Sequence, residues 1–145
     1  MGPSEEGRRL DSSLYERLGG KDGISAVVQS FSGRVGGDAR INQKFARTNV
    51  PRLRALLAEQ ICEATGGPFI YTGRGMKESH AGMAVTEGEF NAMVDDLTAA
   101  LDEHKVAKDD QRKVLAFFAS LRDQVVEVDS AETGTALPDT FQPAT

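Results

Sequence analysis

Tryptophan is absent from the 145-residue chain, and it holds only two tyrosines, two histidines and one cysteine. So few aromatic rings, with a formal net charge of −5, argue against a nucleic-acid-binding surface, which needs stacking platforms and a clustered basic face. The single cysteine, Cys62, excludes an internal disulfide and any metal site built from several cysteines.

Long apolar runs are also missing, so the sequence predicts no membrane-spanning helix. The first residues lack the apolar stretch of a secretory signal, which makes the cytoplasm the expected location. The length fits one domain. We expect a flexible N-terminal extension at 1–11, a globular domain at 12–128 and a disordered tail at 129–145, where periodic apolar residues give way to Ser, Thr, Pro and acidic residues.

Helical periodicity is the pattern that is present. Apolar residues recur at three- and four-residue spacing in four stretches, with no convincing strand between them, so the fold class is all-α. Capping residues mark starts at Ser13, Asn49 and Thr86, and the first and last of these form capping boxes with Glu16 and Glu89. Glycine pairs mark ends. The expected helix faces run over Ile24–Val35, Leu53–Ala64, Phe90–Leu101 and Val114–Val125, with short helical pieces at 13–18, 41–45 and around residue 80.

His80 lies in a segment where glycine restricts helix length. Gly73 and Gly75 precede it and Gly82 follows, which leaves room for one or two helical turns. Such a short helix suits the presentation of one ring nitrogen to a buried cofactor. By residue type alone, however, a lone histidine is more often structural or solvated, and apolar stripes mostly fill a core. The other histidine, His104, lies among charged residues at a helix end and receives no such role.

Several motifs, in order along the chain from Leu14 to about Val126, resemble those of one known family. They are Leu-Tyr-Glu-Arg-Leu-Gly-Gly at 14–20, Gly-Gly-Pro at 66–68, Tyr-Thr-Gly at 71–73 and Met-Lys ahead of His80. Together they resemble truncated haemoglobins, most closely the first of three groups. The lack of tryptophan on the helix that holds Met93 argues against the other two groups. The resemblance implies a 2-on-2 helical sandwich with a very short proximal helix around a non-covalently bound haem b.

The resemblance also implies residue roles. His80 matches the proximal iron ligand, and Phe45 matches the phenylalanine that stacks on the haem. Thr72 and Lys77 match positions near the haem edge or its propionates, with Arg52 and Arg74 as alternatives at the rim. The apolar slot is expected to be lined by Phe31, Phe45, Leu53, Leu57, Met76, Val85, Met93 and Leu97.

The distal side departs from the family pattern. The expected gas pocket is formed by Phe31, Ser32, Leu53 and Leu57. Ser32 stands where this group often has tyrosine, and both leucines stand where it often has glutamine. Because a hydrogen-bond donor in a dry pocket stabilises bound oxygen, we expect weak oxygen stabilisation here, with a five-coordinate ferrous iron that still binds nitric oxide and carbon monoxide.

Reversible binding of diatomic gases is the first interpretation, and two alternatives stay open. One is a haem enzyme, a nitric oxide dioxygenase or peroxidase-like catalyst, of which the dioxygenase needs a stable oxygen complex and a reductase partner. The other is a cofactor-free helical interaction module, in which the apolar helix faces only fill the protein core. The sequence shows no nucleophile triad and no phosphate-cradling loop. We expect no nucleic-acid or membrane partner, and a monomer or weak homodimer.

Overall fold

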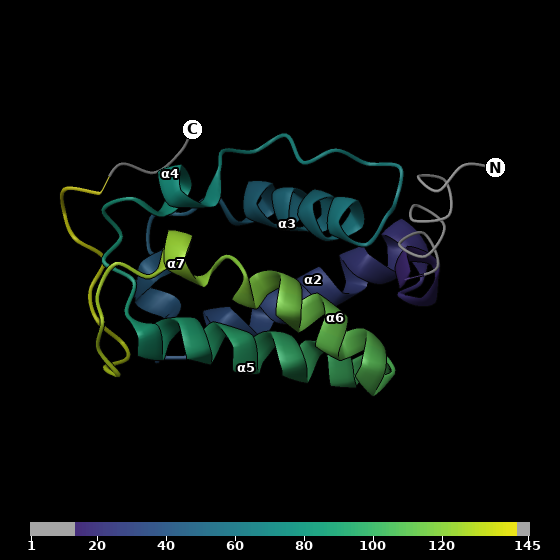
Figure 1. The fold of residues 1–145 in the computed structure, drawn as a ribbon. Coiled ribbons are helices and arrows are strands. Elements are labelled where there is room, and N and C mark those ends of the chain that lie inside the picture. Colours follow the sequence, from purple (N-terminus) through teal and green to yellow (C-terminus); the bar gives the residue numbers. More distant parts are fainter. Residues whose placement is uncertain (1–13, 142–145) are drawn as a thin grey trace.

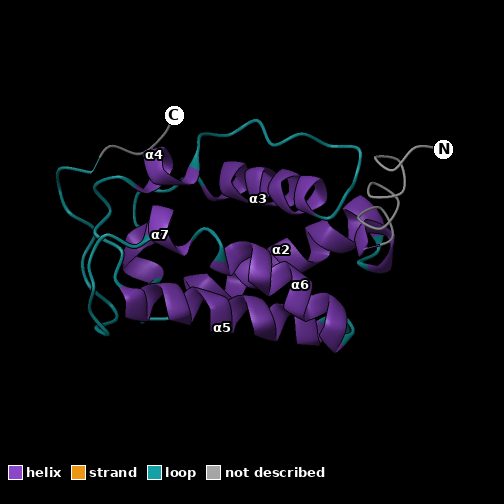
Figure 2. Cartoon of the chain, viewed as in Figure 1, coloured by secondary structure: helices purple, strands orange, loops and turns teal. Residues whose placement is uncertain are grey.

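The computed structural model describes residues 14–141, and every regular element in this range is a helix, which confirms the all-α class (Figure 2). The predicted extension at 1–11 lies outside the described residues. No helix within 14–141 is both long enough and apolar enough to cross a membrane. The elements are α2 (Gly20–Gly36), the 3-10 helix η1 (Asn42–Phe45), α3 (Val50–Ala64), α4 (Met76–His80), α5 (Glu87–Glu103), α6 (Lys108–Ala119) and α7 (Arg122–Val125).

Helix α2 is the centre of the fold, because it packs against both α3 and α5, while α6 packs on α5 and α4 on α7 (Figure 1). Its predicted apolar face is buried, as the helical spacing requires. A helical turn at 14–17 precedes it and is separated from it by Leu18 and Gly19; Gly19 and Gly20, the first residue of α2, have φ angles of +93° and +65°. Glycine adopts this left-handed region without steric cost, which explains why the two helical pieces meet there.

Helix α3 starts as predicted, but its apolar stripe is only partly covered by protein. The Asn49 side chain accepts a hydrogen bond from the Arg52 backbone N–H at 3.2 Å, which caps the helix. Gln60 and Ile61 of the predicted stripe are buried, whereas Leu53, Leu56, Leu57 and Ala64 are half-buried. The N-terminal half of α3 therefore carries leucine side chains that the rest of the chain does not fully enclose.

Helix α5 begins with the predicted capping box, in which Thr86 and Glu89 accept hydrogen bonds from each other's backbone N–H. The predicted last helix, in contrast, is interrupted: α6 ends at Ala119 and α7 begins at Arg122. Ser120 follows α6, and its hydroxyl donates to the Phe117 carbonyl. This local hydrogen bond competes with continuation of the helix.

The C-terminal segment differs most from the sequence-based expectation. Disorder was expected from residue 129, yet residues 129–141 pack against the start of α5 (Figure 1). The backbone N–H groups of Glu87 and Gly88 donate to the carbonyls of Val128 and Ser130 at 3.2 and 3.1 Å. Phe141 is buried in a second apolar cluster with Met83, Val85, Phe90 and Val125. A prediction of disorder from composition fails when a distant part of the same chain binds the segment.

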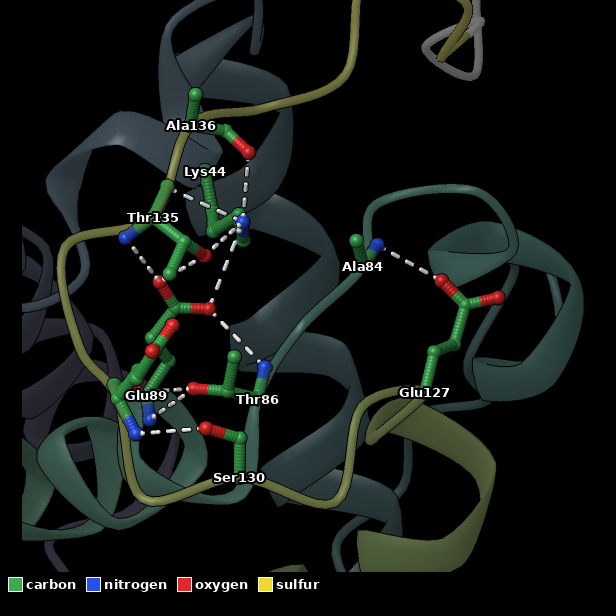
Figure 3. Close-up of polar contacts among 9 residues, drawn as sticks. Lys44, Ala84, Thr86, Glu89, Glu127, Ser130, Thr135 and Ala136 are labelled. Carbon is green, nitrogen blue, oxygen red and sulfur yellow. Dashed lines mark hydrogen bonds and ion pairs between the residues drawn. The ribbon is translucent and has the colours of Figure 1, made fainter.

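That partner is a buried ion pair, shown in Figure 3. The side chains of Lys44 and Glu89 are 1% and 0% exposed, and Lys44 Nζ lies 3.5 Å from Glu89 Oε1. Lys44 Nζ also donates to the carbonyls of Thr135 and Ala136 at 3.1 and 2.9 Å and to Thr135 Oγ1 at 2.7 Å. Glu89 Oε2 accepts from the Thr135 N–H and hydroxyl, both at 2.7 Å. We call Lys44, Glu89, Thr135 and Ala136 the Lys44 clasp.

Candidate functional site

The helix that carries His80, α4, is five residues long. It starts after Gly75, whose extended ψ of 155° cannot continue a helix, and it ends before Ala81, whose ψ is 127°. A helix of one turn gains little from its own hydrogen bonds, so its position depends on its neighbours. The predicted very short proximal helix is present, and it packs against α7.

The His80 imidazole is held at one nitrogen. Nδ1 lies 2.8 Å from the Met76 carbonyl oxygen and 3.0 Å from Ser79 Oγ. Because a carbonyl can only accept, Nδ1 carries the ring proton and Nε2 keeps its lone pair. Burial lowers the pKa of His80 below its ordinary value, although the Met76 carbonyl and the charge of Glu127 act in the opposite direction. The ring is therefore neutral at pH 7 with one nitrogen fixed, the state in which histidine binds metals.

The predicted apolar lining divides between two clusters of the core. Phe31 and Leu97 are buried in the larger cluster, on which Phe45 and Leu57 pack. Val85 is buried in the second cluster, on which Met76 packs. Met93 packs against both clusters and so marks the place where they meet, whereas Leu53 belongs to neither. Five of these side chains are only half-buried: Phe45, Leu53, Leu57, Met76 and Met93.

A separate cavity of about 510 Å³ lies between α2 and α3. Its lining includes Lys21, Arg54, Phe69 and the buried Cys62, and it shares no residue with the predicted cofactor lining. Burial raises the pKa of the Cys62 thiol, as for a small side chain within the core. Within the described range, no cluster of three or more His, Cys, Asp or Glu side chains is arranged to hold a metal ion.

Comparison with known proteins decides the family. Residues 13–127 match the family model for bacterial-like globins. Among curated proteins, the chain is 32% identical to a group 1 truncated haemoglobin of Mycolicibacterium paratuberculosis, over 79% of this chain and 84% of that protein. It is 36% identical to one from Synechocystis, over 68% and 82%. The chain belongs to the truncated haemoglobin family.

Solved structures agree with this assignment. The truncated haemoglobin of Tetrahymena pyriformis in its Fe(III) form superposes with a TM-score of 0.74 at 27% identity, covering 78% of this chain and 97% of that one. The 2/2 haemoglobin of a Synechococcus species, with covalently attached haem, gives a TM-score of 0.74 at 28% identity over the same shares. The 2-on-2 fold predicted from the sequence motifs is thereby confirmed, and membership of this family implies a haem-binding globin.

The residues of the predicted gas pocket offer no uncommitted hydroxyl proton. The Ser32 hydroxyl donates to the Gln29 carbonyl at 3.0 Å and accepts from Arg54 Nε at 2.7 Å. Its proton is thus already committed to the backbone of α2. Leu53 and Leu57 follow on α3 with purely apolar side chains.

At the predicted rim the two polar residues differ. The Thr72 hydroxyl and N–H both donate to Glu59 Oε1, at 2.7 and 3.0 Å, and these bonds lower the pKa of Glu59. Lys77 is exposed, and no described residue forms an ion pair with it. Of the alternative cations, Arg74 lies 3.7 Å from Glu78. Neither Lys77 nor Arg52 forms an ion pair with a described residue, whereas Arg74 does.

Sequence reasoning missed two features near this site. Lys44, beside Phe45, resembles any solvated lysine in the sequence, yet it is buried in the clasp. Glu127 resembles a surface acid, yet its carboxylate accepts from the backbone N–H groups of Gly82 and Ala84. Figure 3 shows the contact with Ala84. Nothing local in the sequence predicts either contact, since the partners lie more than 40 positions away.

Proposed function

We propose that this truncated haemoglobin binds haem b non-covalently, with His80 as the only protein ligand to the iron, and reversibly binds oxygen, nitric oxide and carbon monoxide. The observation that carries the proposal is the His80 ring. Its Nδ1 is bonded to the Met76 carbonyl, so the lone pair of Nε2 remains for a metal. A haem held by His80 would supply the iron chemistry that binds a diatomic gas.

The residues present fit a haem. A porphyrin needs apolar contacts on both faces and cations near its carboxylates. Half-buried apolar side chains on η1, α3, α4 and α5 supply the first: Phe45, Leu53, Leu57, Met76 and Met93. Their partial exposure does not fit the alternative in which these apolar faces only fill a core, because such residues would be fully buried.

Lys77, exposed and free of carboxylate partners in the described range, supplies a cation for a propionate. Thr72 is less suited to that role, because its hydroxyl already donates to Glu59.

On the distal side we propose a site without a strong donor. The Ser32 proton is directed to the Gln29 carbonyl, and the leucines of α3 have none to give. A bound oxygen molecule carries partial negative charge and loses the stabilisation that a donor provides, whereas carbon monoxide depends on it less. This disfavours the nitric oxide dioxygenase alternative, which requires a long-lived oxygen complex and a reductase. The cytoplasmic location and the monomeric or weakly dimeric state stay predictions of the sequence.

Absorption spectra of the purified protein test the function. The ferrous protein is expected to show a five-coordinate high-spin spectrum and to convert to a sharp low-spin spectrum with carbon monoxide. His80→Ala is expected to lose the haem band, and His104→Ala, at the exposed end of α5, is the matched control that keeps it. A six-coordinate spectrum without added ligand refutes the open site. Haem retained equally in His80→Ala refutes the ligand assignment.

A further inference from the structure

The chain makes a tight turn directly after His80. The Met83 N–H donates to the His80 carbonyl at 3.1 Å, Ala81 has φ −59° and ψ 127°, and Gly82 has φ +85°. These are the angles of a type II turn, which needs a positive φ at its third residue and so favours glycine there. The backbone that follows His80 is therefore part of the turn.

Ala84, two residues after Gly82, also has a positive φ, +57°. Alanine rarely adopts this left-handed conformation, because its Cβ crowds the backbone, so an outside contact must hold it.

Glu127 supplies that contact. Its carboxylate accepts from the Ala84 N–H at 2.8 Å and from the Gly82 N–H at 3.1 and 3.0 Å, one distance to each oxygen. The backbone around Glu127 is anchored too, because the N–H groups of Glu127 and Val128 donate to the Val85 carbonyl at 2.9 and 3.1 Å. Hydrogen bonds to an ionised carboxylate are stronger than those between neutral groups. The turn is thus held against the segment that follows α7.

We propose that Glu127 is the positioning residue for the proximal ligand, fixing the turn after His80 and through it the direction in which the imidazole presents Nε2. This rests on the proposed role of His80. The ring is bonded at one end to Met76, four residues earlier, and its backbone continues into the clamped turn. A helix of one turn cannot hold the ring alone. Freeing the turn allows the His80 backbone to rotate and Nε2 to swing with it.

The test compares Glu127→Ala and Glu127→Gln with Glu132→Ala. Glu132 is the matched control, since it lies on the same segment with an exposed side chain and uses only backbone atoms in its hydrogen bonds. Two measurements are made: amide hydrogen exchange of Gly82 and Ala84 in the protein as purified, and the iron–histidine stretching band of the ferrous haem-loaded protein by resonance Raman spectroscopy.

In Glu127→Ala, both amides are expected to exchange at least about tenfold faster, as for a lost hydrogen bond to a charged acceptor, and the iron–histidine band is expected to shift and broaden. Glu127→Gln keeps one acceptor oxygen and gives intermediate values; it carries the test if Glu127→Ala does not fold. Glu132→Ala behaves as wild type. An unchanged band with faster amide exchange overturns the proposal alone, because the clamp is then merely structural. A wild-type protein that takes up no haem overturns the proposed function and this inference together.

Discussion

Replacement of Lys44 by methionine tests whether the Lys44 clasp fastens the C-terminal segment. The buried ammonium makes three hydrogen bonds to Thr135 and Ala136 and lies 3.5 Å from Glu89. Each hydrogen bond to a charged group stabilises the folded state by about 1.5–3 kcal/mol. Removing water from the buried ammonium costs several kcal/mol, which offsets part of this stabilisation. Removing one partner of a buried pair leaves the other uncompensated, so we expect Lys44→Met to lower the free energy of unfolding by about 3–5 kcal/mol.

The same substitution is also made in a chain truncated after Val128, which lacks Thr135 and Ala136 and so exposes the Lys44 side chain to water. There Lys44→Met is expected to cost less than about 1 kcal/mol, the contribution of an exposed ion pair. The coupling between truncation and substitution is therefore at least about 2 kcal/mol.

Urea unfolding at pH 7, followed by circular dichroism, measures the four proteins of this cycle. Lys113→Met, an exposed lysine on α6, is the control and is expected to change stability by no more than about 0.5 kcal/mol. Additive effects within about 0.5 kcal/mol would show that Lys44 and the C-terminal segment act independently, which refutes the clasp.

Three further predictions follow from single side chains. Burial and a hydrogen bond to Asp38 raise the pKa of Asp96 from 3.8 to about 7, so the folded state binds more protons between these values and loses stability as the pH rises through them. Asp96→Asn removes that loss. The difference in the free energy of unfolding between Asp96→Asn and wild type, measured by thermal unfolding, is expected to favour the variant by about 1–3 kcal/mol more at pH 8 than at pH 4. An equal difference at both pH values contradicts this. Ala84→Gly relieves the positive φ of +57° and is expected to raise the free energy of urea unfolding by about 1 kcal/mol, and destabilisation counts against strain at this position. Ser32→Tyr supplies a longer donor and is expected to slow oxygen dissociation about tenfold in stopped-flow measurements, with carbon monoxide dissociation as the control; an unchanged oxygen rate argues against a donor-poor distal side.

Local sequence signals predicted the helices because the decisive interactions are local. The face of α2 follows from spacing alone, and the starts of α3 and α5 follow from the side chains of Asn49 and Thr86, which cap backbone within three residues. The break between α6 and α7 was missed, because Ser120 is compatible with a helix until its hydroxyl bonds the Phe117 carbonyl.

The site was predictable in part for a different reason. The roles of His80 and Phe45 were predicted from motifs and stay predictions, while the Met76 carbonyl lies one helical turn before His80, where a helix places it. Lys44 and Glu127 were not identified, since a buried lysine and a turn-clamping glutamate have no signature until distant backbone meets them. Those contacts join positions 91 and 43 residues apart, so composition and periodicity carry no trace of them.

These two missed contacts come from one stretch of chain. Glu127 holds the turn after His80, and Thr135 and Ala136 hold Lys44, the neighbour of Phe45. His80 and Phe45 are the two residues that the family pattern assigns to the haem, and the backbone between them runs through α3 and a long loop. A short segment after α7 thus ties together both parts of the site by a direct route. The family match ends at residue 127, so the part of this tie that reaches Lys44 lies beyond it. The segment after α7 therefore supports the proposed pocket from the C-terminal side, in addition to the helical elements that carry His80 and Phe45.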